Sequence, residues 1–229
     1  MTHPTIGKIT VQKLDLRREL KYLLAPPAAR VEIVDVPKFN FVMLDGRIEP
    51  GQTVGGSPVF QEAVAALYGI SYTLKFMLKR RRASPVDYPV MPLEGLWWTD
   101  SGAFDQDPSQ PMNWTLMMMQ PAPVTPALYA DVLEQLKRKK DSPVLRRVRL
   151  EKFHEGLSIQ TMHIGPYSDE ARTLDGMKAF VETSGLRYRG RHHEIYLGDP
   201  RRAAPEKLRT ILRHPVEKLA ARQNVPVAA

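Results

Sequence analysis

The sequence of 229 residues contains no cysteine. This absence excludes disulfide bonds, thiolate zinc sites and a thiol nucleophile, and it is typical of a protein from a reducing compartment. No apolar run approaches the roughly 20 residues needed to cross a bilayer. The N-terminus also lacks the basic and then apolar stretches of a secretion signal. We therefore expect a cytoplasmic protein that does not contact membranes.

The composition is that of a folded protein, with 43% hydrophobic and 25% charged residues. A chain of this length can form one large domain or two fused small ones, each with a sizeable core. The net charge of +8 raises the question of a nucleic-acid partner. However, the basic clusters at 79–82 and 137–140 fall at the predicted ends of helices, where cations favour the helix dipole. We therefore do not expect nucleic acid as a partner; a monomer and a homodimer both fit the sequence.

The most informative feature is an apparent duplication. Residues 87–98 and 187–197 each form a predicted strand with one glutamate inside it, and each follows a strand and a helix and precedes another strand. Alternating β-branched and aromatic residues predict the strands, and Ser57-Pro58 and Thr125-Pro126 predict helix starts. The repeat predicts an α+β fold: a duplicated strand-helix-strand-strand module with pseudo-twofold symmetry, antiparallel sheets lining a central ligand cleft, and helices packed on the outer side.

The same pattern predicts the domain organisation. Residues 1–30 form an N-terminal helical extension, with its helix at 15–24, and residues 31–219 form one ligand-binding domain. Its halves cover about 31–121 and 148–219 and are joined by a connector helix at about 125–140. Residues 220–229 are expected to be a tail.

Strand alternation predicts which side chains share a face of the sheet. His192, Glu194 and Tyr196 point one way, and the residues between them point the other. In the first half Glu94 has the parity of Trp98, while Trp97 points to the opposite face unless Gly95 marks a β-bulge. The sequence thus leaves open which tryptophan faces the cleft.

A carboxylate among aromatic side chains predicts a site for flat aromatic or cationic molecules. Burial among aromatics raises the pKa of a carboxyl group, which makes Glu194 a candidate general base. The alternative is that Glu94 and Glu194 are outward-facing strand charges, since alternating strands often place polar residues in water. The ligand-binding candidates are Tyr68, Tyr72, Glu94, Trp97, Trp98, Trp114, His163, Tyr167 and Tyr196.

The run His192-His193-Glu194 has the composition of a metal site. Adjacent strand residues face opposite ways, however, so only His192 and Glu194 lie together, and two ligands are too few for a zinc site. We expect neither a metal nor a cofactor.

Three motifs carry a resemblance to a known family: Met91-Pro-Leu-Glu-Gly-Leu-Trp-Trp98, Met162-His-Ile-Gly-Pro-Tyr167 and His192-His-Glu-Ile-Tyr-Leu197. With these, the chain resembles the GyrI-like small-molecule-binding proteins from about residue 31 to 215, and in particular the stand-alone members without a DNA-binding domain. The resemblance implies two modules around a central cleft, in which an acid of the strand at 193–196 meets cationic aromatic drugs. Some similar stand-alone members are cyclopropanoid cyclopropyl hydrolases, which open DNA-alkylating natural products within an aromatic cage.

These observations predict a protein that binds hydrophobic aromatic or cationic xenobiotics and detoxifies them. In the hydrolytic version, Glu194 activates a water molecule that opens an electrophilic cyclopropane. Two alternatives stay open: a binding module that sequesters drugs without chemistry, and a modulator of a DNA-handling enzyme.

Overall fold

The computed structural model describes residues 10–28, 30–105, 107, 109–140 and 142–219. The predicted tail at 220–229 and the start of the predicted extension, residues 1–9, lie outside the described residues. The main elements follow the chain in this order: β1 (Gln12–Lys13), α1 (Leu16–Glu19), α2 (Lys21–Leu24), β2 (Glu32–Val36), β3 (Phe39–Ile48), α3 (Pro58–Lys79), β4 (Val86–Asp87), β5 (Leu93–Thr99), β6 (Met112–Gln120), α4 (Pro126–Lys139), β7 (Arg149–Phe153), β8 (Gly156–Ile164), α5 (Ala171–Thr183), β9 (Leu186–Tyr188), β10 (His192–Tyr196) and β11 (Arg209–Lys218).

The predicted duplication is confirmed by the strand order of one large sheet. The order is β2-β8-β11-β10-β5-β6-β3-β7, with β9 paired to β11, and each of these pairings is antiparallel. The units β3-α3-β5-β6 and β8-α5-β10-β11 follow the same plan, and their third elements, the strands β5 and β10, pair at the centre. The α+β class and the pseudo-twofold arrangement are therefore confirmed, although the two halves build one continuous sheet.

The strand that precedes each unit along the chain pairs with the other unit. β2 comes before the first unit along the chain but pairs with β8 of the second, and β7 comes before the second unit but pairs with β3 of the first. The sequence pattern did not predict β7. This exchange of strands joins residues distant in sequence and links the two halves within one sheet.

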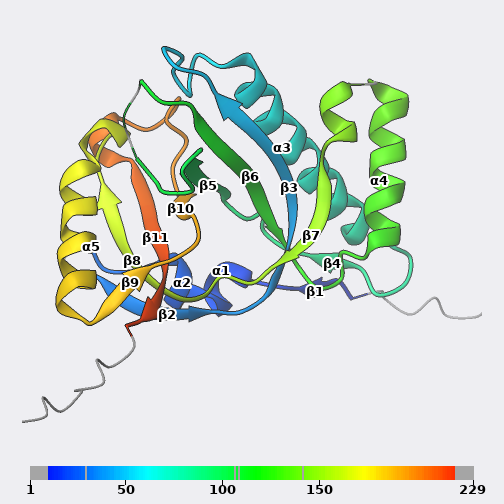
Figure 1. The fold of residues 1–229 in the computed structure, drawn as a ribbon. Helices are drawn as coiled ribbons and strands as arrows, with labels where there is room; N and C mark the ends of the chain where they lie inside the picture. The colour runs from blue at the N-terminus through cyan, green and yellow to red at the C-terminus, as the bar shows by residue number, and fades with distance from the viewer. Residues whose placement is uncertain (1–9, 29, 106, 108, 141, 220–229) are drawn as a thin grey trace, which may run out of the picture.

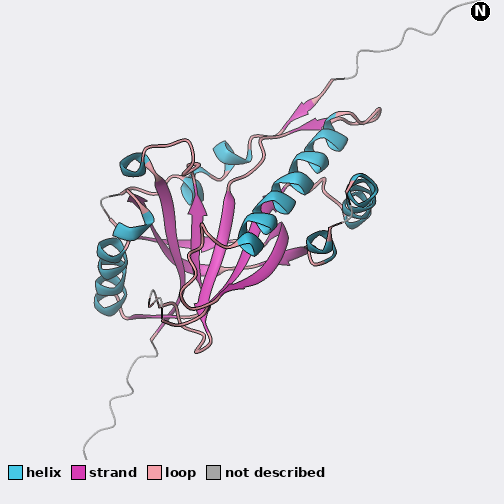
Figure 2. Ribbon diagram, turned by 90° about the horizontal axis from the view of Figure 1, so that it is seen from above, coloured by secondary structure: helices cyan, strands magenta, loops and turns pink. Residues whose placement is uncertain are grey.

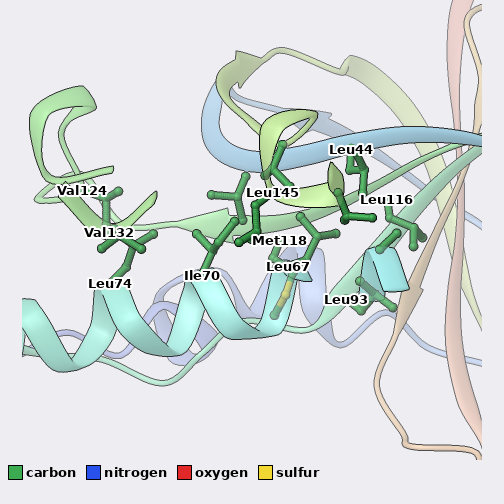
Figure 3. Close-up of a cluster of buried hydrophobic side chains, with 14 of the residues drawn as sticks. Leu44, Leu67, Ile70, Leu74, Leu93, Leu116, Met118, Val124, Val132 and Leu145 are labelled. Atoms are coloured by element: carbon green, nitrogen blue, oxygen red, sulfur yellow. The ribbon is translucent and has the colours of Figure 1, made fainter. Parts of the chain in front are cut away.

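The long helix α3 begins and packs as its sequence predicts. The Phe60 backbone N–H donates to the Ser57 hydroxyl at 3.4 Å, and Pro58 occupies the first turn. One side of α3 packs on the sheet through residues that include Leu67, Ile70 and Leu74, which are fully buried (Figure 3). This apolar contact is the largest part of the core, and it fixes α3 against β3, β5 and β6.

Two helices cover one face of the sheet. Glu194 of β10 pairs with Leu212 of β11 on one side and with Gly95 of β5 on the other, so these residues point to the same face. Leu212 packs with α5, and Trp97, two residues after Gly95, packs in the α3 cluster. α5 and α3 thus share a face and stand at opposite ends of the sheet (Figure 1). The short helices α1 and α2 pack on the other face, and the view from above shows helices flanking the strands on both sides (Figure 2). None of the helices in the described part of the chain is long and apolar enough to span a membrane.

Candidate functional site

The central strand β10 presents an acid to the face shared by α3 and α5. Glu194 lies opposite Gly95 of β5, and its neighbours on the same face, His192 and Tyr196, lie opposite Trp97 and Leu93. The alternation expected within β10 is therefore observed. Glu194 is 8% exposed, so its carboxylate is mostly withdrawn from bulk water.

A hydrogen bond between the two central strands orients the phenol beside Glu194. Trp97 Nε1–H donates to Tyr196 Oη at 2.9 Å, and the Trp97 ring also stacks on Phe60 at 6.0 Å between centroids. Gly95 makes room for this bond, because a Cβ there would lie 2.8 Å from Trp97 Nε1 and 3.1 Å from Tyr196 Oη. Of Trp97 and Trp98, it is thus Trp97 that lies on the Glu194 face.

A second carboxyl group, which the sequence did not single out, belongs to the same site. Glu170 directly precedes α5, makes no capping hydrogen bond with its side chain, and is 2% exposed. Burial, and secondly the charge of Glu194, raises the pKa of Glu170 to about 9. Near neutral pH Glu170 therefore keeps its proton. Glu170 is thus a proton donor beside Glu194.

Two tyrosines supply further proton donors. Burial, together with the charge of Glu194 and a hydrogen bond to it, raises the pKa of Tyr196 well above its ordinary value. Burial and the nearby charge of Glu194 likewise raise the pKa of Tyr167 to about 12. The two rings meet edge to face at 5.9 Å. Both hydroxyls stay protonated at any physiological pH and can donate hydrogen bonds.

Several buried polar atoms on this face have no hydrogen-bond partner within the described residues. They include Glu170 Oε1, Trp114 Nε1, both ring nitrogens of His192, and Oγ1 of Thr210, which lies opposite Tyr196. An unsatisfied buried polar atom costs about 1–3 kcal/mol, and native proteins contain few of them. A group of such atoms around a carboxylate indicates a place where water or a ligand binds.

The remaining candidates differ in how far they are buried. Tyr68 of α3 is half-buried, and burial is the main reason that its pKa is raised. The charge of Asp199 contributes to this shift and also to the raised pKa of Tyr167. Tyr72 stacks on Tyr68 at 6.3 Å but is 48% exposed. Trp114 is fully buried under Phe60, and its indole covers Gly46. Tyr68 is thus partly enclosed on α3, whereas Tyr72 lies at the surface.

His163 is held by bonds at both ring nitrogens. Its Nδ1 lies 2.9 Å from Thr173 Oγ1 and its Nε2 lies 3.1 Å from the Pro166 carbonyl oxygen. This arrangement joins the end of β8 to the turn before α5 and positions Tyr167.

The structure does not bring Glu94 and Trp98 to this face. Glu94 lies opposite Ile195 rather than Glu194, and its Oε2 is 3.0 Å from His193 Nε2 on the α1–α2 side of the sheet. Trp98 lies on that side too, with the Arg191 guanidinium 3.6 Å from its ring centre. The expected cleft with one strand carboxylate from each half is therefore corrected: the second carboxyl group is Glu170, at the start of a helix.

On the α1–α2 side, Glu94 belongs to a paired charge cluster. His193 Nδ1 lies 3.0 Å from Glu155, and Arg213 lies 3.2 Å from Glu155 and donates to the Leu23 carbonyl at 2.8 Å. The cavity beside this cluster measures about 10 Å³, which is room for one water molecule at most. Across the described ranges, no three histidine or acidic side chains gather closely enough to hold a metal ion.

Comparison with known proteins identifies the family. The model of the GyrI-like small molecule binding domain matches residues 29–217. The chain belongs to the GyrI-like family. Two solved structures from Listeria innocua are similar to it: an uncharacterized conserved protein (41% identity, 89% of this chain and 100% of that chain, TM-score 0.79) and a protein described as a hydrolase (40% identity, 90% of this chain and 100% of that chain, TM-score 0.78). No curated protein matches the sequence. As a GyrI-like domain, the chain carries a small-molecule-binding fold.

Proposed function

We propose that this GyrI-like protein is a hydrolase of hydrophobic aromatic or cationic xenobiotics, and specifically of electrophilic cyclopropanoid compounds, with Glu194 as the base that activates water. The observation that carries the proposal is the buried carboxyl pair, in which Glu170 keeps its proton near neutral pH while Glu194 lies next to it. A buried carboxyl group that keeps its proton beside a second carboxyl group can act as the proton donor in acid–base catalysis.

The surroundings of the pair fit a flat, electrophilic ligand. Trp97, Tyr167 and Tyr196 supply aromatic surface and hydroxyl donors within the same face. The carboxylate of Glu194 favours a ligand with a positive or electron-poor ring. A similar protein from Listeria innocua is described as a hydrolase, which supports hydrolytic chemistry on this fold.

In the proposed reaction, Glu194 takes a proton from water as the water oxygen attacks the methylene carbon of a cyclopropane conjugated to a carbonyl group. The new C–O bond forms as the C–C bond of the ring opens. The released electron pair moves through the conjugated system to the carbonyl oxygen, which takes the proton of Glu170. One water is thereby added across the ring, and no oxidant or reductant is needed.

Mass spectrometry of the ligand tests this proposal. The protein is incubated with a spirocyclopropyl-cyclohexadienone alkylator in ¹⁸O-labelled water, with a protein-free sample as the control for spontaneous opening. We expect a ring-opened product that carries one labelled oxygen, formed at least about 100-fold more slowly by Glu194→Gln, the typical contribution of a general base.

The opposite result separates the alternatives. If the compound is recovered unchanged while tryptophan fluorescence reports saturable binding, the protein sequesters its ligand and the hydrolase proposal is wrong.

A further inference from the structure

His192 is the histidine next to Glu194 on the proposed catalytic face. It is fully buried, and its imidazole stacks on Phe104 at 4.1 Å with 21° between the planes. Phe104 belongs to the loop between β5 and β6, so this loop fixes the ring plane from the first half of the chain. The ring therefore has a defined orientation on the strand that carries the acid.

One ring nitrogen of His192 lies near Glu194. Nε2 lies 3.5 Å from Glu194 Oε1, and neither ring nitrogen has a hydrogen-bond partner within the described residues. The other imidazole nearby is that of His214, 5.6 Å away, and burial lowers the pKa of His214 to about 3, so it carries no charge that would repel His192. Glu194 is the acceptor within reach of Nε2.

The two other buried histidines show what a structural role looks like in this protein. His163 uses both ring nitrogens to join β8 to the start of α5. His193, the next residue along β10, lies within 3.0 Å of a carboxylate at each nitrogen. His192 has neither arrangement, and an apolar ring would fill its place beside Phe104 without leaving two nitrogens unsatisfied.

We infer that His192 is a positioning residue for Glu194: its Nε2–H donates to Oε1 and holds the carboxylate in place to receive the proton of water. This inference rests on the proposed function. The 3.5 Å separation shortens to a hydrogen bond when the site is filled, as catalytic hydrogen bonds often do on going from free to liganded enzyme. The Tyr196 hydroxyl also interacts with the Glu194 carboxylate.

Three substitutions of His192 test the inference through turnover. Glutamine places an N–H donor near the position of Nε2, asparagine places it near Nδ1, and phenylalanine offers none. With the cyclopropanoid alkylator, we expect kcat to fall about 10- to 100-fold for His192→Phe and His192→Asn, with KM unchanged, and less for His192→Gln. A residue that merely fills space would instead be replaced best by phenylalanine. Equal kcat in all three variants and the wild type would overturn the inference.

A second measurement does not depend on turnover. Two-dimensional ¹H–¹⁵N spectra of the imidazoles report which ring nitrogen carries the proton. We expect the Nε2–H form of His192, with a ring signal that moves in Glu194→Gln while the His163 signal stays in place. The Nδ1–H form, or a His192 signal unaffected by Glu194→Gln, would overturn the inference. If the wild type lacks turnover, the proposed function fails, and these spectra still decide whether His192 is bonded to Glu194.

Discussion

His193 and Glu194 are neighbours on β10 but lie on opposite faces of the sheet, in contrasting surroundings. On the α1–α2 face, His193 stands between Glu94 and Glu155 at 3.0 Å from each, and Arg213 completes the cluster. On the α3–α5 face, Glu194 lies near a second carboxyl group, Glu170, and the imidazole of His192, whose ring nitrogens form no hydrogen bond within the described residues. The ion pairs of the first face serve the fold, whereas the polar groups of the second face, which lack opposite charges of this kind, belong to the site that we propose for ligand and chemistry.

The largest expected effect comes from breaking the paired cluster. Arg213→Met removes one partner of a buried ion pair and leaves the charge of Glu155 less compensated, so we expect the free energy of unfolding to fall by about 3–5 kcal/mol. Urea denaturation measures this loss. The matched control is Arg187→Met, which breaks an exposed pair with Glu217 and should cost less than about 1 kcal/mol. Similar losses in both variants would contradict the structural role of the cluster.

The paired cluster also has a characteristic pH dependence. Although burial alone would lower it, the charges and hydrogen bonds of Glu155 and Glu94 raise the pKa of His193 from 6.5 to about 9. The stabilisation is fully present below pH 6.5 and is lost as the pH rises through 9, and it amounts to roughly 3 kcal/mol at most.

We therefore expect His193→Gln to be less stable than the wild type at pH 6 and the difference to shrink by pH 9.5. Denaturant titrations at the two pH values measure it. A difference that does not change with pH would show that His193 is uncharged in the folded protein.

On the opposite face, replacing the ionisable residue Glu170 should stabilise the protein rather than destabilise it. The raised pKa of Glu170 means that the folded protein keeps this proton up to about pH 9, whereas the unfolded chain releases it near 4.5. Stability therefore falls across this interval, and Glu170→Gln should stabilise the protein by roughly 1–3 kcal/mol at pH 8 and by little at pH 4.

Thermal unfolding at both pH values checks this prediction. Asp169→Asn is the matched control, because it removes an exposed carboxylate next to Glu170. A destabilised Glu170→Gln protein at pH 8 would mean that Glu170 serves the fold rather than the site.

The sequence predicted the fold better than the site, for physical reasons. Local patterns revealed the repeated modules and the face of Glu194, since strand alternation depends only on neighbouring residues. The repetition misled us about Glu94, because a shift of one residue in the pairing of two strands moves a side chain to the other face. Glu170 had no periodic signal, as an acid at the start of a helix is common. The exchange of β2 and β7 depends on long-range pairing that no local pattern records.

The most direct test of the account compares matched acids on the two faces. Glu194→Gln and Glu94→Gln are assayed side by side for hydrolysis of the cyclopropanoid alkylator and for the free energy of unfolding. We predict that Glu194→Gln keeps its stability and loses turnover by at least about 100-fold, whereas Glu94→Gln turns over like the wild type per folded molecule but unfolds more easily. Loss of turnover in Glu94→Gln with normal activity in Glu194→Gln would contradict the assignment of chemistry to the α3–α5 face.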